Sequence, residues 1–308
     1  MKYLFGPVPS RRLGISLGID LVPYKTCSLD CIYCECGETT RKTVIRRAYV
    51  PFDQVIKEIK IFLKSKPYLD YITFSGSGEP TLNSDIGKIV RFLKKNYPQY
   101  KIAVLTNGTL LYRRAVRKDL MNADLVIPSF DAASKKIFQK INRPHPGITL
   151  EKMILGLQKF KQEFKGKIWV EVFVAKSIND SQAEINKIKK VLDKINPERI
   201  QFNTLDRPGT IPTLKPVSET ELKKIIIQIP NAEVIAKCPD KSKFYGETSK
   251  NIDEVILRLI SRRPVTIQDL HIILNIRITE INKHIRVLKQ QNKIIEKNGK
   301  RGTFFSLK

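Results

Sequence analysis

The sequence predicts an α/β fold with a parallel sheet over most of the chain, followed by a small module of three helices and a hairpin. From the N-terminus to about residue 235, short β-rich runs alternate with amphipathic stretches. Repeated strand–helix units imply a parallel sheet with right-handed crossover connections. After residue 250 the pattern changes to three helical segments and two β-rich runs. The 308-residue chain is long enough for one large domain and a second, small one.

Six apolar runs are the strand candidates of the larger part. They cover residues 13–19, 71–74, 102–105, 125–127, 168–173 and 200–202. Two of the segments between them show a single apolar face at helical spacing. These faces are formed by Val55, Ile56, Ile59 and Leu63, and by Ile86, Ile89, Val90 and Leu93.

Three cysteines follow the first strand candidate within eight residues. Cys27, Cys31 and Cys34 have the spacing C-x3-C-x2-C, and the aromatic residue Tyr33 precedes the third cysteine. Three thiolates on one loop can ligate three irons of a [4Fe–4S] cluster. Because no fourth cysteine lies at a matching offset, one iron stays open for another ligand.

Two other uses of the cysteines are disfavoured. A partial zinc site is disfavoured because the three histidines of the chain lie far from the triad. A disulfide framework is disfavoured because the chain has five cysteines, an odd number, and because we expect no signal peptide. The remaining two, Cys36 and Cys238, are expected to be small buried apolar residues.

This cysteine pattern, early in a chain of alternating strands and helices, resembles the radical S-adenosylmethionine (SAM) superfamily. The resemblance implies a partial (β/α)6 TIM-type barrel over residues 1–235, with a [4Fe–4S] cluster on Cys27, Cys31 and Cys34. It also implies SAM as a cofactor, which the open iron would chelate through its amino and carboxylate groups. An electron from a donor such as a flavodoxin or ferredoxin would then cleave SAM to a 5′-deoxyadenosyl radical.

The ends of the strands supply the other candidates, because reactive groups in such barrels lie at the C-terminal ends of the strands. The second strand candidate leads into Gly78-Glu79-Pro80, which resembles the family motif Gly-Gly-Glu-Pro. The resemblance implies that Gly78 and Glu79 contact the methionyl amino group. The first glycine of the motif is Ser77 here, so the match is partial.

Polar residues follow the next two strand candidates. Asn107 either orients the cofactor or caps the next helix. Ser129 and Asp131, two apart, should point to the same side of an extended segment. They resemble a Ser-x-Asp motif that contacts the cofactor, although both can instead cap a helix at 132–141. Tyr33 is assigned to the cofactor by the same resemblance.

The segment before the first strand contains paired arginines. Arg11 and Arg12 can hold a phosphate or the carboxylate of the cofactor, or form salt bridges at the barrel floor. The surrounding sequence, residues 6–14, resembles a subgroup of radical SAM proteins that is loosely related to the wyosine-base synthase of transfer RNA.

The C-terminal part predicts a winged helix-turn-helix over residues 251–308, after a linker at 236–250. Thr266-Ile267-Gln268-Asp269 resembles a capping box, and Asn298-Gly299 is a hairpin signal. In that fold the third helix enters the major groove and the wing contacts the backbone. Basic residues on these two elements are nucleic-acid candidates: Arg277, Lys283, Arg286, Lys289, Lys297, Lys300 and Arg301. Peptide binding by this module is the alternative.

The formal net charge of +26 favours a polyanionic partner, although a lysine-rich composition can also reflect genome bias. No apolar run approaches the ~18–20 residues that span a bilayer, and we expect a cytoplasmic protein. The favoured function is radical modification of RNA, with transfer RNA first. A radical enzyme acting on a peptide is second, and a DNA-binding regulator with a redox-sensing cluster is third.

Overall fold

The computed structural model describes residues 1–235 and 252–308. The predicted linker at 236–250 and Cys238 lie outside the described residues. Within the described ranges, no helix is both long enough and apolar enough to cross a membrane.

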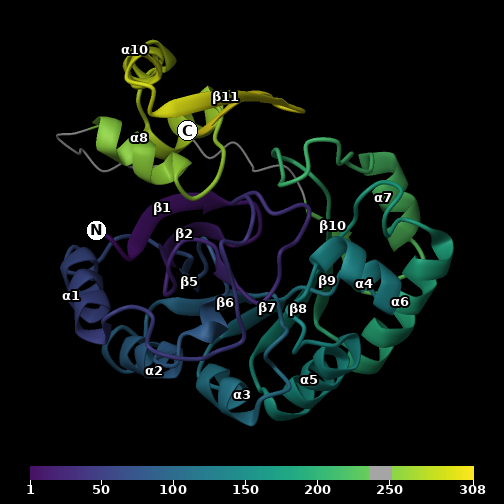
Figure 1. The fold of residues 1–308 in the computed structure, drawn as a ribbon. Coiled ribbons are helices and arrows are strands. Elements are labelled where there is room, and N and C mark those ends of the chain that lie inside the picture. The colour runs from purple at the N-terminus through teal and green to yellow at the C-terminus, as the bar shows by residue number, and fades with distance from the viewer. Residues whose placement is uncertain (236–251) are drawn as a thin grey trace.

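One eight-stranded sheet forms the centre of the larger part, in the order β1-β2-β5-β6-β7-β8-β9-β10 (Figure 1). Its strands are β1 (Leu4–Ser10), β2 (Gly14–Ile19), β5 (Tyr71–Phe74), β6 (Lys101–Thr106), β7 (Leu125–Pro128), β8 (Lys167–Phe173), β9 (Arg199–Asn203) and β10 (Ala232–Val234). All neighbours pair in parallel except β1, which is antiparallel to β2. The six predicted strands are therefore confirmed as a parallel set, while the edge strands β1 and β10 were not predicted.

Helices line the outer side of the curved sheet, as in a partial TIM-type barrel (Figure 1). They are α1 (Phe52–Leu63), α2 (Ile86–Asn96), α3 (Arg114–Leu120), α4 (Lys135–Asn142), α5 (Leu150–Glu163), α6 (Gln182–Ile195) and α7 (Glu219–Ile226). The predicted apolar faces of α1 and α2 are buried, as their helical spacing required. Two short elements, β3 (Thr26–Cys27) and β4 (Arg41–Lys42), pair beside the sheet.

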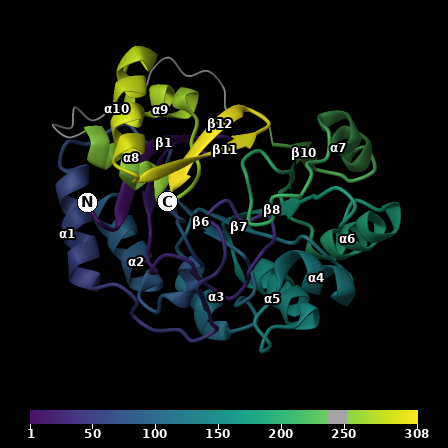
Figure 2. The ribbon, with the colours of Figure 1, turned by 45° about the horizontal axis from the view of Figure 1, so that its top comes forward.

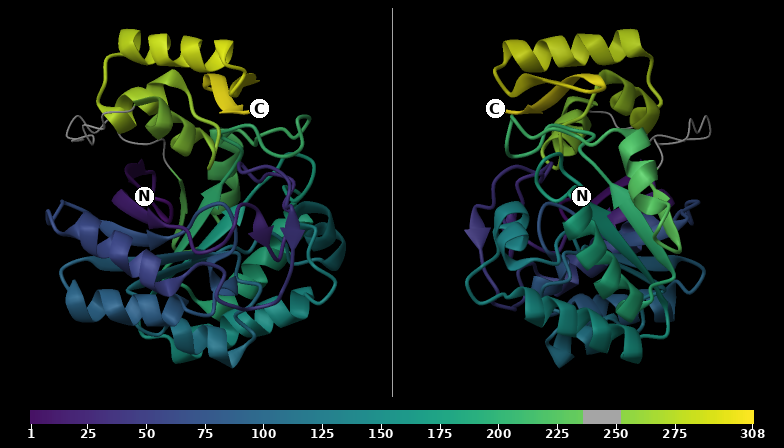
Figure 3. Two further views of the ribbon diagram at one scale, coloured as in Figure 1. Left: turned by 60° about the vertical axis from the view of Figure 1, so that its left-hand side comes forward. Right: turned by 90° about the vertical axis from the view of Figure 1, so that its right-hand side faces the viewer.

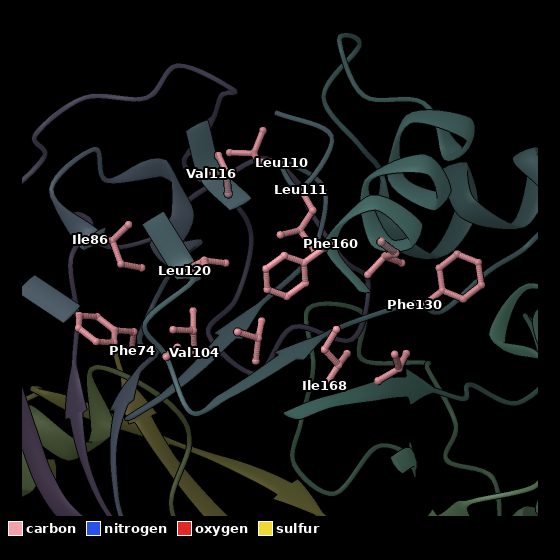
Figure 4. Close-up of a cluster of buried hydrophobic side chains, with 14 of the residues drawn as sticks. Phe74, Ile86, Val104, Leu110, Leu111, Val116, Leu120, Phe130, Phe160 and Ile168 are labelled. Carbon is pink, nitrogen blue, oxygen red and sulfur yellow. The ribbon is translucent and has the colours of Figure 1, made fainter. Parts of the chain in front are cut away.

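The barrel core lies between the sheet and its helices. Figure 4 shows Phe74 and Val104 from neighbouring strands beside Leu120 of α3, with Phe160 of α5 next to them. All four side chains are completely buried. Burying an aromatic or branched apolar side chain contributes roughly 1.5–3 kcal/mol, so this layer holds the strand ends in fixed positions.

Residues 252–308 form a C-terminal module with a second apolar core. It contains α8 (Ile252–Ile260), α9 (Ile267–Leu274), α10 (Ile278–Gln290), β11 (Ile294–Gly299) and β12 (Gly302–Leu307). The predicted capping box is present, because the Thr266 hydroxyl accepts from the Asp269 amide and the Asp269 carboxylate accepts from the Thr266 amide. The hairpin turn lies at Lys300 and Arg301, two residues later than predicted, because Asn298 and Gly299 pair within β11.

The C-terminal module packs on the edge strand β1 (Figures 1 and 2). Val8 of β1 belongs to the apolar cluster of the module, together with Ile256, Leu259 and Ile273. Figure 3 shows α10 along the outermost side of the module, with α8 and α9 nearer to the barrel. One part of the module therefore faces the barrel, and α10 faces away from it.

Candidate active site

The cysteine loop follows β2, at the C-terminal end of the sheet, as predicted. Backbone bonds tie it to α4, because the amides of Asp30 and Ile32 donate to the carbonyls of Asn142 and Ile141 at 3.0 Å each. A turn closes the loop, in which the Cys34 amide donates to the Cys31 carbonyl at 3.1 Å. The triad is therefore held by the barrel wall rather than by a free loop.

Each cysteine sulfur of the triad accepts from a nitrogen. Lys25 Nζ donates to Cys34 Sγ at 3.0 Å. Asn107 Nδ2 donates to Cys27 Sγ at 3.3 Å. Asn142 Nδ2 donates to Cys31 Sγ at 3.4 Å. Donors aimed at sulfur stabilise a thiolate more than a thiol, and such bonds set the reduction potential of an iron–sulfur centre.

The three thiols differ in acidity. Burial, followed by the charge of Glu79, raises the pKa of Cys27 to about 12. Burial, followed by the charge of Asp131, raises the pKa of Cys31 well above its usual value. A side-chain hydrogen bond with Cys36 and the ammonium of Lys25 lower the pKa of Cys34 to about 6, against the effect of burial. Cys34 is therefore the thiolate of the triad at neutral pH.

Glu79 is buried and holds the loop after β6. Its Oε1 accepts from the Thr81 amide at 3.0 Å and from the Thr106 hydroxyl at 2.7 Å, and its Oε2 accepts from the Asn107 amide at 2.7 Å. These bonds place Asn107 beside Cys27. The expected contact of Glu79 with an amino group of the cofactor stays a prediction. Asn107 does not cap the next helix, because α3 begins only at Arg114.

Gly78 permits a close backbone contact behind the triad. A Cβ atom at this position would lie 2.2 Å from the Thr26 carbonyl oxygen and 2.7 Å from a methyl group of Val22. The same contact includes a hydrogen bond from the Glu79 amide to the Thr26 carbonyl at 3.0 Å. Glycine is therefore needed here to place the motif against the strand that carries Cys27.

Ser129 and Asp131 follow β7, and the common direction expected for their side chains stays a prediction. Ser129 lines the cavity described below, whereas Asp131 is buried behind it. Asp131 Oδ2 accepts from the Tyr33 hydroxyl at 2.5 Å and from Asn142 Nδ2 at 2.7 Å. Neither residue caps α4, which begins after Ser134. Asp131 positions Tyr33 and Asn142 through these two bonds.

A cavity of about 630 Å³ lies inside the barrel, beside Cys34. Tyr33 forms part of its wall, with its ring stacked on Phe173 at a centroid distance of 3.8 Å. Residues of the C-terminal module, including Gln268 and Arg301, complete the wall. The cavity is thus shared by the barrel and the module.

Ion pairs connect the module to the barrel at this cavity. Arg301 donates to Asp269 at 2.8 Å and also pairs with Asp206 of the barrel at 3.1 Å. Arg207 of the barrel lies 3.5 Å from Asp269 and 3.3 Å from Glu35 in the cysteine loop. Two carboxylates hold the Arg301 side chain at the cavity, and its predicted nucleic-acid contact stays a prediction.

Arg11 and Arg12 also reach this cavity. Arg11 lies 3.8 Å from Asp206, and Arg12 forms an ion pair with Glu171 of β8. Of the two uses predicted for these arginines, salt bridging is the one observed. The pairs lie on the cavity wall rather than at a separate floor.

The donor set fits an iron–sulfur cluster better than a single metal ion. In the part of the chain that the structure describes, no group of three or more Cys, His, Asp or Glu side chains is arranged to hold one ion. A cluster places each thiolate on its own iron, so its sulfurs need not converge. The nitrogen donor on each sulfur supports bound thiolates.

The comparisons with known proteins agree with this geometry. A family model described as the radical SAM superfamily matches residues 21–187. The chain belongs to the radical SAM superfamily. Members of this superfamily use a [4Fe–4S] cluster and SAM, and the chain is therefore an enzyme whose substrate is unspecified.

Several curated relatives are similar over nearly the whole chain. A UPF0026 protein of Methanocaldococcus jannaschii is 37% identical over 272 residues, which cover 86% of this chain and 84% of that protein. A UPF0026 protein of Helicobacter pylori is 33% identical over 299 residues, which cover 96% of this chain and 94% of that protein. A protein of Brachyspira hyodysenteriae named GTPase Obg is 38% identical over 305 residues, but the chain spans only 44% of its length.

Solved structures share the fold. A radical SAM methyltransferase of Sphaerobacter thermophilus has a TM-score of 0.55 at 17% identity, covering 71% of this chain and 65% of that one. Streptococcus suis SuiB bound to its precursor peptide SuiA has a TM-score of 0.53 at 15% identity, covering 70% of this chain and 48% of that one. The part of the chain before the C-terminal module therefore has the fold of a radical SAM barrel.

Several residues of the site were missed from the sequence. Lys25, Asn142 and Phe173 lie outside the strand-end motifs, and only the fold brings them to the triad. Lys25 lies two residues before Cys27, but its ammonium bonds Cys34, and the spacing in sequence does not report that contact.

Proposed function

We propose that this enzyme uses the 5′-deoxyadenosyl radical of SAM to modify RNA, with transfer RNA as the first candidate. When bound, the cluster and SAM supply the radical. Two features together carry the proposal. A cavity lies beside Cys34, and the C-terminal module that helps to line it exposes α10 on the side away from the barrel. The net charge of +26 supports a polyanionic partner.

The chain's own residues would prepare the site for this chemistry. Lys25, Asn107 and Asn142 hold the sulfurs of the triad, and Asp131 fixes the Tyr33 hydroxyl at the cavity wall. The stacked Tyr33 and Phe173 rings give the cavity an apolar side that excludes water. Gly78, Glu79 and Ser129 stay the proposed contacts or supports of SAM.

The RNA surface we propose comprises α10 and the wing, as in a winged helix-turn-helix. Arg277, Arg286, Lys297 and Lys300 are exposed and form no ion pair among the described residues. Lys283 and Lys289 are also exposed, but each pairs with a glutamate of the module, at 3.3 Å and 2.6 Å. Unpaired cations contribute most to binding a phosphate backbone, since they release counterions without first breaking a salt bridge.

A distant relative supports a nucleotide substrate. A protein of Methanosarcina mazei named probable GTP 3′,8-cyclase is 29% identical over 200 residues, 64% of this chain. Its name describes a reaction on a nucleotide. For the electron we propose a flavodoxin or ferredoxin, and for the compartment the cytoplasm, where thiols stay reduced.

The first experiment tests radical formation and RNA together. The anaerobic, cluster-loaded enzyme is reduced in the presence of SAM with and without total transfer RNA, and 5′-deoxyadenosine is quantified. Nucleosides of RNA from a deletion strain are compared with wild type by mass spectrometry. We expect one modified nucleoside to disappear. An unchanged nucleoside profile contradicts the RNA proposal, and the absence of 5′-deoxyadenosine favours the redox-sensing regulator instead.

The second experiment tests the surface. Replacing Arg286 by Glu should weaken RNA retention and flatten its dependence on salt. Arg91→Glu on α2 is the matched control, because Arg91 is exposed on a helix of the barrel. Equal retention by both variants contradicts the proposed surface.

A peptide is the second candidate substrate, and one observation favours it. Streptococcus suis SuiB, whose fold is similar to that of this chain, has been solved with a precursor peptide bound. If the substrate is a peptide, the C-terminal module would dock a polypeptide, and affinity capture would enrich one polypeptide without retaining RNA.

A further inference from the structure

Arg263 differs from every other arginine on the cavity wall. It follows α8 and lies between Arg262 and Pro264. The four other arginines that line the cavity each form an ion pair with a carboxylate. Arg263 lines the same cavity, and within residues 1–235 and 252–308 its side chain forms no hydrogen bond or ion pair.

The neighbouring carboxylates do not balance the positive charge of Arg263. Burial, and then the repulsive charge of Arg207, lower the pKa of Arg263 to about 10. Glu35 and Asp269 act in the opposite sense, but both are already paired with Arg207. Arg263 is partly exposed and lines the cavity. A guanidinium that faces a cavity without a carboxylate partner is placed to bind an anion that enters there.

Other polar atoms of the same wall are also unused. Arg207 Nε, Ser16 Oγ and Thr73 Oγ1 are buried and have no hydrogen-bond partner among the described residues. All three residues line the cavity. These three atoms are themselves covered, whereas Arg263 is partly exposed and is therefore the unpaired group that an entering anion can reach directly.

We propose that Arg263 binds a phosphate group of the substrate inside this cavity. The proposal deepens the proposed function, on which it rests, by naming the group that an RNA substrate presents here. Guanidinium groups bind phosphate and carboxylate through paired N–H donors. The carboxylate of SAM is therefore the one competing source of an anion, and the test separates the two.

Inorganic phosphate is the probe. It is titrated by calorimetry into the cluster-loaded full-length protein in a phosphate-free buffer, for wild type, Arg263→Gln, Arg263→Lys and the exposed control Arg91→Gln. Losing a charged hydrogen bond lowers affinity about 10- to 100-fold. We expect that loss for Arg263→Gln, a smaller loss for Arg263→Lys, and none for Arg91→Gln. Equal affinity in all four proteins, or an equal loss in Arg91→Gln, overturns the proposal.

A thermal-midpoint measurement separates a loss of phosphate binding from a loss of folded structure. Because Arg263 has no partner to lose, the thermal midpoint of Arg263→Gln without phosphate should equal or exceed that of wild type. A lower midpoint means that Arg263 supports the fold and overturns the assignment.

SAM affinity is measured on the same proteins. Unchanged SAM affinity in Arg263→Gln supports a substrate phosphate, whereas a parallel loss assigns the anion to the SAM carboxylate and overturns the proposal. Formation of 5′-deoxyadenosine by wild type, without added substrate, tests the proposed radical function independently of the phosphate titration.

Discussion

Replacing Asp269 by Asn should loosen the C-terminal module from the barrel. Asp269 is 12% exposed and accepts from Arg301 at 2.8 Å and 3.2 Å, with Arg207 at 3.5 Å. Asparagine keeps the size of the side chain but removes its negative charge. The guanidinium groups of Arg207 and Arg301 then lose the carboxylate that both contact. Burial raises the pKa of Asp269, but the bonds from Arg301 together with the charge of Arg207 lower it below its usual value, so the fold stabilises the ionised form.

The magnitude follows from the contacts that remain. Removing one partner of a buried ion pair costs about 3–5 kcal/mol. Arg301 keeps Asp206 at 3.1 Å and Arg207 keeps Glu35 at 3.3 Å, so we expect the lower end, about 3 kcal/mol. Thr266→Ala is the matched control, because it removes only the helix cap and should cost about 1 kcal/mol.

Hydrogen-exchange mass spectrometry of residues 252–308 measures this loss directly. Fluorescence of Trp169, the single tryptophan, reports the barrel in the same samples. We expect Asp269→Asn to speed exchange in α9 and β11 far more than Thr266→Ala does, with little change in the barrel. If the two variants lose the same free energy, the ion pairs do not hold the module and the reasoning is refuted.

Three further predictions concern the cysteine site. Gly78→Ala should abolish stable cluster binding, because its Cβ would lie 2.2 Å from the Thr26 carbonyl oxygen; normal absorbance of the reconstituted cluster would contradict this. Burial raises the pKa of Asp131 to about 6 in the folded state, above the ordinary 3.8, so the folded state binds the extra proton and stability falls as pH rises from about 4 to 6. Relative to Asp131→Asn, cluster-free wild type should lose on the order of 3 kcal/mol across that range in urea unfolding, and a difference independent of pH would refute the shift. In cluster-free protein at pH 7, iodoacetamide should alkylate Cys34 before Cys27, since their pKa values are about 6 and about 12; peptide mass spectrometry showing equal rates would count against it.

The sequence was sufficient for the parallel strands because each is an apolar run with a helix after it. It was not sufficient for β1, which contains Gly6, Pro7 and Pro9 and therefore shows no strand pattern. β1 is stabilised by pairing with β2 and by packing against a module more than 200 residues away along the chain, and no local signal reports such contacts. The hairpin turn was misplaced for a related reason, since the 294–299 and 302–307 pairing overrode the local preference of Asn298-Gly299.

The site also contains residues that the sequence predicts and residues whose positions depend on tertiary packing. The cluster ligands are close together in sequence, and their spacing alone carries the chemistry. Whether Ser129 and Asp131 cap a helix depends on where α4 begins, which sequence patterns give only to within a few residues. The position of Arg301 depends on how two parts of the chain pack together, and no pattern within either part predicts it.

The shared packing on β1 has a consequence for any shortened form of the chain. A protein cut at residue 235 would leave β1 as an open sheet edge with the apolar side chains of Phe5 and Val8 uncovered. Exposed, hydrophobic edge strands template intermolecular pairing. We therefore expect the isolated barrel to aggregate. In the full chain the C-terminal module covers the edge strand β1 as well as lining the cavity.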